Sequence, residues 1–92
     1  MKNIKLTKSA KQKFINIVDN LDTNGIIHYL NKVITGGDEL EDLKDKNIWI
    51  YIKLQDLKSR ETCLVYIYRD KVFVFDHIDD ILWCVNVLKL HS

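Results

Sequence analysis

The second half of this 92-residue chain contains basic side chains, a histidine and a tyrosine whose chemistry suits phosphodiester cleavage. That reaction needs cations that stabilise the charge developing on phosphate, together with a group that transfers a proton. Histidine suits proton transfer because its unperturbed pKa is about 6.5. A nuclease could hold the phosphate with Arg60 and Arg69, neutralise charge with Lys53, and transfer a proton through His77 or Tyr66. The alternative is that these are ordinary charges at strand ends.

A second group of basic residues lies near the start of the chain, with no acidic residue among them. Lysines at the front of a helix oppose the positive end of its dipole. This mismatch indicates use in binding RNA, DNA or an acidic protein, and a solvated lysine-rich face is the alternative. The residues proposed for nucleic-acid or partner binding are Lys5, Lys8 and Lys11, joined by Lys71 from the second half.

The totals predict a single domain, residues 1–92, with one core, because 47% of the residues are apolar. A net charge of +1 gives no overall attraction for nucleic acid or membrane, so RNA would have to be bound by a local patch. No apolar run approaches the roughly 20 residues of a membrane span. The opening Met-Lys-Asn-Ile-Lys lacks the apolar core of a signal peptide. We therefore expect a cytoplasmic protein with no membrane partner.

Metal and cofactor sites are not expected. Cys63 and Cys84 each lie in an apolar run and form no Cys-x-x-Cys motif, which favours two buried thiols in a reducing cytosol over a disulfide or a reactive thiol. His28 and His91 have no second ligand at metal-binding spacing.

Local patterns in the first half predict a short strand over Ile4–Leu6 and then two amphipathic helices. Thr7 or Ser9 would cap the first helix, whose apolar residues continue at helical spacing to Leu21. Thr23 or Asn24 would cap the second helix, and the glycines 36–37 would end it in a left-handed conformation. A short turn between them favours an antiparallel pair. The stretch 38–47 reads as a charged connection.

The second half predicts strands. Alternation over 47–54 indicates a half-buried strand, 55–60 a bend, and 62–68 a central strand because it is apolar on both faces. Arg69-Asp70 is a candidate two-residue turn into a further strand over 71–76. The tail suits either a strand or a short helix capped by Asp79 or Asp80, and we favour the helix.

Together these elements predict an α+β fold, with two antiparallel helices on an antiparallel sheet of three or more strands and a short C-terminal helix. The predicted core consists of Phe14, Ile17, Val18, Leu21, Ile27, Leu30, Ile34, Ile50, Ile52, Val65, Ile67 and Val74.

The opening Ile-Lys-Leu-Thr-Lys-Ser-Ala-Lys-Gln-Lys-Phe resembles the start of ParE/RelE-type toxins, which begin with a short strand, a Thr or Ser turn and a long amphipathic helix. The likeness continues in Leu43-Lys-Asp-Lys-Asn-Ile-Trp-Ile-Tyr-Ile-Lys, similar to the leucine, loop and first hairpin strand of that family. Cys63-Leu-Val-Tyr-Ile-Tyr-Arg-Asp-Lys-Val-Phe-Val-Phe resembles the two strands that follow. The resemblance covers about residues 3–77 and implies an endoribonuclease of the mRNA interferase type, or a toxin that blocks a protein target.

Two departures bear on activity. Cys63 stands where the resemblance calls for arginine, and Asp76, Asp79 and Asp80 stand where it calls for positive charge. Each loss of a well-placed cation costs on the order of 100- to 1,000-fold in rate. We therefore expect a ParE/RelE-like relative that acts on a cytosolic target by binding and inhibition more than by RNA cleavage, with a cognate antitoxin or host protein as partner. The alternative is a non-catalytic phage or mobile-element inhibitor of a host protein.

Overall fold

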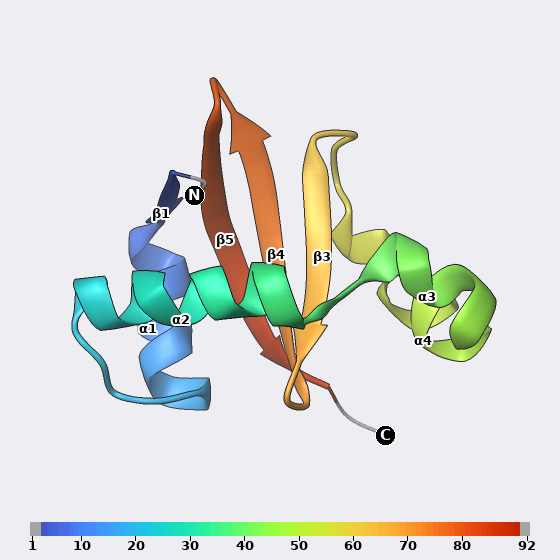
Figure 1. Cartoon of the computed structure of the whole chain (residues 1–92), viewed down its shortest axis with the longest axis horizontal. Helices are drawn as coiled ribbons and strands as arrows, with labels where there is room; N and C mark the ends of the chain where they lie inside the picture. The colour runs from blue at the N-terminus through green and yellow to red at the C-terminus, as the bar shows by residue number, and fades with distance from the viewer. Residues whose placement is uncertain (1–2, 91–92) are drawn as a thin grey trace.

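The computed structural model describes residues 3–90, which form an α+β arrangement of helices around one sheet (Figure 1). The expected fold class is confirmed at this level. His91 lies outside the described residues. In chain order the elements are β1 (Ile4–Leu6), α1 (Lys8–Ile17), α2 (Thr23–Gly36), β2 (Asp38–Glu39), α3 (Leu40–Lys46), α4 (Ile48–Leu54), the short 3-10 helix η1 (Gln55–Leu57), β3 (Cys63–Tyr68), β4 (Lys71–Ile78) and β5 (Ile81–Lys89).

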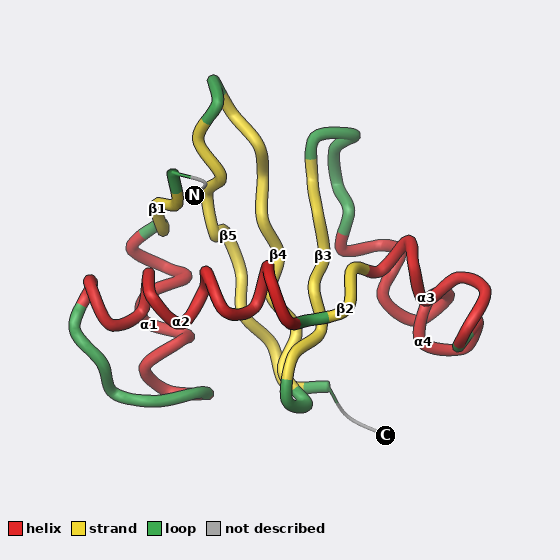
Figure 2. The backbone as a smooth tube through the Cα atoms, viewed as in Figure 1, coloured by secondary structure: helices red, strands yellow, loops and turns green. Residues whose placement is uncertain are grey.

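The sheet has five strands in the order β1-β5-β4-β3-β2 (Figure 2). The strands β3, β4 and β5 form an antiparallel meander, whereas β1 pairs with β5 in parallel, so the sheet is mixed and not purely antiparallel. The predicted Arg69-Asp70 turn is confirmed, and both of its residues have positive φ. A second such turn at Asp79-Asp80 joins β4 to β5.

The first helix begins as predicted, because the Ala10 N–H donates to the Thr7 hydroxyl at 3.1 Å. It ends at Ile17, which is earlier than predicted. The cap of α2 is Asp22 and not Thr23 or Asn24, since the Gly25 N–H donates to Asp22 Oδ1 at 2.7 Å. The two helices cross in Figure 1 instead of lying antiparallel, because α1 packs along β5 while α2 runs across the front of the sheet.

The end of α2 falls at the predicted glycines for a different reason. Gly37 does not take the left-handed conformation, since its φ is −87°. A Cβ at this position would lie 2.5 Å from the Val33 carbonyl oxygen and 2.9 Å from the Ile67 carbonyl oxygen. Glycine therefore allows the chain to leave α2 in close contact with β3.

The prediction of a strand over 47–54 is wrong, because this segment is the helix α4. Its inward side chains Ile50, Tyr51 and Leu54 follow a helical spacing and pack in the core. Asn47 caps the helix, with its Oδ1 accepting from the Ile50 N–H at 3.3 Å. The charged connection before it forms β2 and α3, and β2 occupies the edge of β3 where a strand over 47–54 would have paired.

The prediction of a C-terminal helix is also wrong, because residues 81–89 form the strand β5. Asp79 and Asp80 adopt φ values of 50° and 64°, which turn the chain back along β4 and do not cap a helix. The strand lies between β1 and β4 in the sheet, so its apolar residues are used on both faces.

The outer edge of β5 is open beyond Cys84, the last residue that pairs with β1. The register with β4 shifts near this point, between Val74 and Phe75. Asn86 follows the shift, and its Oδ1 accepts from the Val87 N–H at 3.0 Å and from Lys13 Nζ at 2.7 Å. The Asn86 side chain thus satisfies a backbone donor of this edge.

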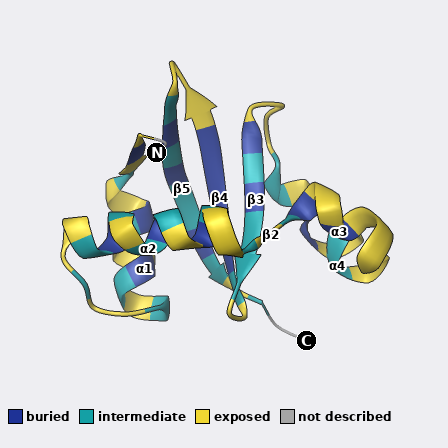
Figure 3. Cartoon of the chain, viewed as in Figure 1, coloured by how far each residue is buried: buried dark blue, intermediate teal, exposed yellow. Residues whose placement is uncertain are grey.

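The core consists of two clusters, one on each face of the sheet. Figure 3 shows buried positions along β3, β4 and β5. The larger cluster packs α1 and α2 on the sheet around Phe14 and Phe73, and the smaller one packs Leu40 and Leu54 against β3 and β4. Of the predicted core, Phe14, Leu30, Val65 and Val74 are buried. Partly buried and packed against the clusters are Ile17, Val18, Leu21, Ile27, Ile34, Ile50 and Ile67. Ile52 is exposed, because α4 is a helix and turns this side chain outward.

Candidate functional site

The two arginines proposed to hold one phosphate lie at opposite ends of β3. Arg60 precedes the strand, near the Cys63–Asp76 pair, whereas Arg69 follows it in the turn after the Tyr68–Lys71 pair. Five residues of extended strand separate the two pairs, which corresponds to roughly 16 Å. A single phosphate spans only a few ångströms, so the structure does not bring Arg60 and Arg69 together on one phosphate.

Arg60 is instead paired with a buried carboxylate. Its Nη1 lies 3.2 Å from Asp76 Oδ2, and the Thr62 hydroxyl donates to Asp76 Oδ1 at 2.5 Å. Asp76 is 6% exposed, and it is the buried charged residue of the part of the chain that is described. The sequence indicated this role, because Asp76 stands two positions after Val74 and four after Val72, on the same side of the strand. The charge of Arg60 is therefore already compensated within the molecule.

The proposed proton-transfer groups and Lys53 lie on separate elements. His77 is exposed near the end of β4, next to Asp76 but on the opposite face of that strand. Tyr66 packs edge-on against Phe75, and burial raises the pKa of its hydroxyl, with the charges of nearby acids adding to the effect. Lys53 is exposed on α4, outside the sheet. These three groups therefore come from α4, β3 and β4.

The N-terminal lysines point to different parts of the molecule. Lys5 Nζ lies 5.8 Å from the centre of the Trp83 ring, whereas Lys11 Nζ donates to the Thr23 hydroxyl at 2.8 Å. Lys8 is exposed at the start of α1, whose first turn contains no acid. These three lysines therefore form no single basic face.

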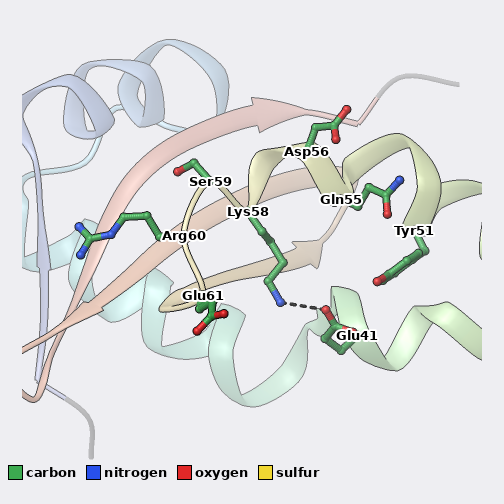
Figure 4. Close-up of a pocket in the computed structure, with 8 residues that line it drawn as sticks. All are labelled: Glu41, Tyr51, Gln55, Asp56, Lys58, Ser59, Arg60 and Glu61. Carbon is green, nitrogen blue, oxygen red and sulfur yellow. Dashed lines mark hydrogen bonds and ion pairs between the residues drawn. The ribbon is translucent and has the colours of Figure 1, made fainter.

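A wide, open hollow of about 550 Å³ lies between α3, α4 and the loop before β3 (Figure 4). Lys58 Nζ bridges it at 2.8 Å from Glu41 Oε1, and the hydrogen bond and charge of Lys58 lower the pKa of that exposed carboxylate. Its lining residues are Glu41, Tyr51, Gln55, Asp56, Lys58, Ser59, Arg60 and Glu61. Within residues 3–90 no group of three or more His, Cys, Asp or Glu could hold a metal ion. The hollow is therefore lined by polar and charged side chains and contains no such metal-binding group.

The outward side of α4 is apolar, which sequence reasoning missed because it placed this segment in a strand. Trp49 is 78% exposed, and it is flanked by Ile48 at 44% and Ile52 at 49%. These residues are one position or three to four positions apart, so they share one side of the helix. We call Ile48, Trp49 and Ile52 the α4 apolar face. The signal that could have found it was the run Ile-Trp-Ile-Tyr-Ile, which has more apolar residues than one buried side needs.

Two further proposed residues lie at the far end of the meander. Arg69 Cζ lies 5.3 Å from the centre of the Tyr68 ring, and Lys71 stands opposite Lys89 on β5. Both predicted buried thiols are confirmed, since Cys63 and Cys84 are free and buried.

Comparison with known proteins gives no match to a protein-family model, to a curated protein or to a solved structure. Across the described residues, 3–90, no helix is long and apolar enough to cross a membrane.

Proposed function

We propose that this chain acts by binding a protein partner through the α4 apolar face, and not by cleaving RNA. The observation that carries the proposal is the exposure of Trp49, at 78%, between two exposed isoleucines. Tryptophan is enriched among the residues that dominate binding energy in protein interfaces. Contiguous exposed apolar side chains on a small domain mark interaction surfaces, because their hydration is unfavourable until a partner covers them.

The arrangement of the cations supports binding over cleavage. Arg60 and Arg69 lie at the two ends of β3, and Arg60 is engaged by Asp76. An RNA-cleaving site would need several cations around one phosphate, because the charge that develops there must be stabilised from more than one side.

The nature of the partner follows from the resemblance to ParE/RelE-type toxins, which remains part of the proposal. A short strand, two helices and an antiparallel meander occur in the order that the resemblance implies, although the meander spans residues 63–89. The segment that resembles the first hairpin strand of the family is α4 in this chain. Under this proposal the partner is a cognate antitoxin or a cytosolic target protein. Under the alternative, it is a host protein inhibited by a phage or mobile-element product.

The test is site-specific photocrosslinking in a bacterial host. A photoreactive amino acid at Ile52 should crosslink to a defined protein, whereas the same group at the exposed Lys32 of α2 should not. Trp49→Ala should weaken binding of the crosslinked protein by at least about tenfold. It should leave the free energy of unfolding within about 0.5 kcal/mol, because the side chain is mostly exposed.

Two results would contradict the proposal. One is crosslinking from position 52 only to a second copy of the chain. The other is rapid cleavage of RNA by the purified protein that Arg60→Ala or His77→Ala abolishes. If the captured protein is encoded by a neighbouring short gene, the partner is an antitoxin, and a host enzyme would favour the inhibitor alternative.

A further inference from the structure

Positive charge is concentrated where the β3–β4 turn meets the end of β5. Tyr68 pairs with Lys71 on the neighbouring strand, and Lys71 pairs with Lys89 on the next one. Arg69 projects from the turn beside this row, with its Cζ 5.3 Å from the centre of the Tyr68 ring. We call Tyr68, Arg69, Lys71 and Lys89 the hairpin-end cluster. The β3–β4 turn and the end of β5 lie at the bottom of the meander in Figure 1, below α2.

Two features of the hairpin-end cluster oppose the stability of the free protein. Lys71 and Lys89 are directly opposite each other, and like charges in that position are destabilising. Arg69 adopts a φ of 49°, in the left-handed region that favours glycine, asparagine and aspartate. Local rules broken in this way cluster at functional sites, where the surrounding structure holds the unfavourable arrangement in place.

The backbone of the cluster is held in place before any ligand arrives. The Leu90 N–H donates to the Asp70 carbonyl oxygen at 3.0 Å, which ties the chain after β5 to the turn. The Tyr68 ring packs edge-on against Tyr29 of α2, with 5.7 Å between ring centres. The acid within the turn is Asp70, which is exposed and balances only one of the three cations. Such a fixed arrangement lowers the entropy cost of binding an anion.

We propose that the hairpin-end cluster binds an acidic segment of a partner protein. Arg69 presents a planar guanidinium that can pair with a carboxylate through two hydrogen bonds, and the two lysines act as point charges beside it. A nucleic acid fits this surface less well, because unspecific binding of single strands uses exposed aromatic rings for stacking. Here Tyr29 meets the Tyr68 ring at its edge and Arg69 covers it. The site is separate from the α4 apolar face and does not depend on it.

The test is fluorescence anisotropy with a labelled oligoglutamate peptide at low salt, where exposed charges are least screened. The full chain should bind this probe, and Lys89→Glu should weaken binding by more than about tenfold, because it removes a cation and adds an acid. The same substitution should raise the melting temperature, since it replaces a repulsive cross-strand pair by an attractive one. Arg69→Asn should likewise weaken binding while favouring the turn.

The matched control is Lys46→Glu, which makes the same charge change at an exposed position of α3. It should change probe binding by less than about twofold. Equal weakening by Lys46→Glu and Lys89→Glu would show attraction to overall charge only and would overturn the proposal. Tighter binding of a labelled oligodeoxythymidine than of oligoglutamate, with the same sensitivity to Lys89→Glu, would also overturn it, because the site would then serve nucleic acid.

Discussion

At the scale of single residues, Asp76 joins the loop before β3 to β4. Its carboxylate accepts from the Thr62 hydroxyl and pairs with Arg60, and it is almost fully buried. We expect Asp76→Ala to cost about 1 kcal/mol of unfolding free energy, because it removes the hydrogen bonds from Thr62 and Arg60, whose exposed side chains can then bind water instead. Urea melts measure this loss, and Glu61→Ala, at an exposed residue of the same loop, serves as the control. Equal costs for both variants would show that the Asp76 contacts contribute nothing.

Cys84 gives the protein a stability that depends on pH. Burial raises the pKa of its thiol from 9.0 to about 12. The folded chain therefore keeps this proton between about pH 9 and pH 12, while the unfolded chain releases it. Stability should be unaffected below pH 9 and should fall above it, by about 1.4 kcal/mol per pH unit from this group. Urea melts at about pH 8 and pH 10 should show a smaller decline for Cys84→Ala. Parallel declines in both proteins would assign the effect to other groups.

At the scale of elements, the start of α2 depends on one carboxylate. Asp22 Oδ1 accepts from the Gly25 N–H at 2.7 Å, whereas Asn24 is an exposed residue of the first turn. We expect Asp22→Ala to cost about 1 kcal/mol, since it leaves a backbone donor of the first turn unpaired. Asn24→Ala should cost only a few tenths of this amount. Chemical denaturation of the two variants separates them, and a larger loss for Asn24→Ala would move the cap to that residue.

Local signals predicted some of the elements that are decided by neighbours in sequence. The Thr7 cap of α1 and the Arg69-Asp70 turn between β3 and β4 were predicted correctly, because a cap and a two-residue turn involve only adjacent residues. The segment 48–54 could not be assigned in this way. Its isoleucines and aromatic residues favour strands intrinsically. It forms a helix because Asn47 caps it and Leu54 packs in the smaller core cluster. The residues that Leu54 packs with there include Val72 and Val74, which are distant in sequence.

The candidate site was predicted only in part for a related reason. The strand predicted over 62–68 already placed Arg60 and Arg69 at its opposite ends, so their separation could have been inferred from the sequence. Lys71 was proposed for partner binding, whereas its neighbour Lys89 was not considered because the tail was predicted to be helical. The register of β5 on β4 is a tertiary property, so no local pattern indicates that these two lysines meet.

At the scale of the whole molecule, packing against the sheet determines which apolar side chains contribute most to stability. Phe14 is fully buried and contacts the rings of Tyr29 and Phe73, whereas Ile52 is about half exposed. Phe14→Ala should cost about 3–5 kcal/mol, because a large cavity opens in the main cluster. Ile52→Ala should cost only about 1 kcal/mol, since about half of its surface remains exposed to water. Urea melts of both variants test this contrast, and similar losses would show that α4 packs with its opposite side inward.

The Asn86 side chain has a consequence for contacts between molecules. Beyond Cys84 the outer edge of β5 has no strand beside it, and an unpaired edge can recruit a strand from another chain. The side-chain Oδ1 of Asn86 accepts from the Val87 N–H, and Lys13 Nζ donates to the same oxygen. An incoming strand would have to displace both before it could form its first hydrogen bond there. The Asn86 side chain therefore occupies one backbone donor of this edge that a strand from another chain could otherwise use.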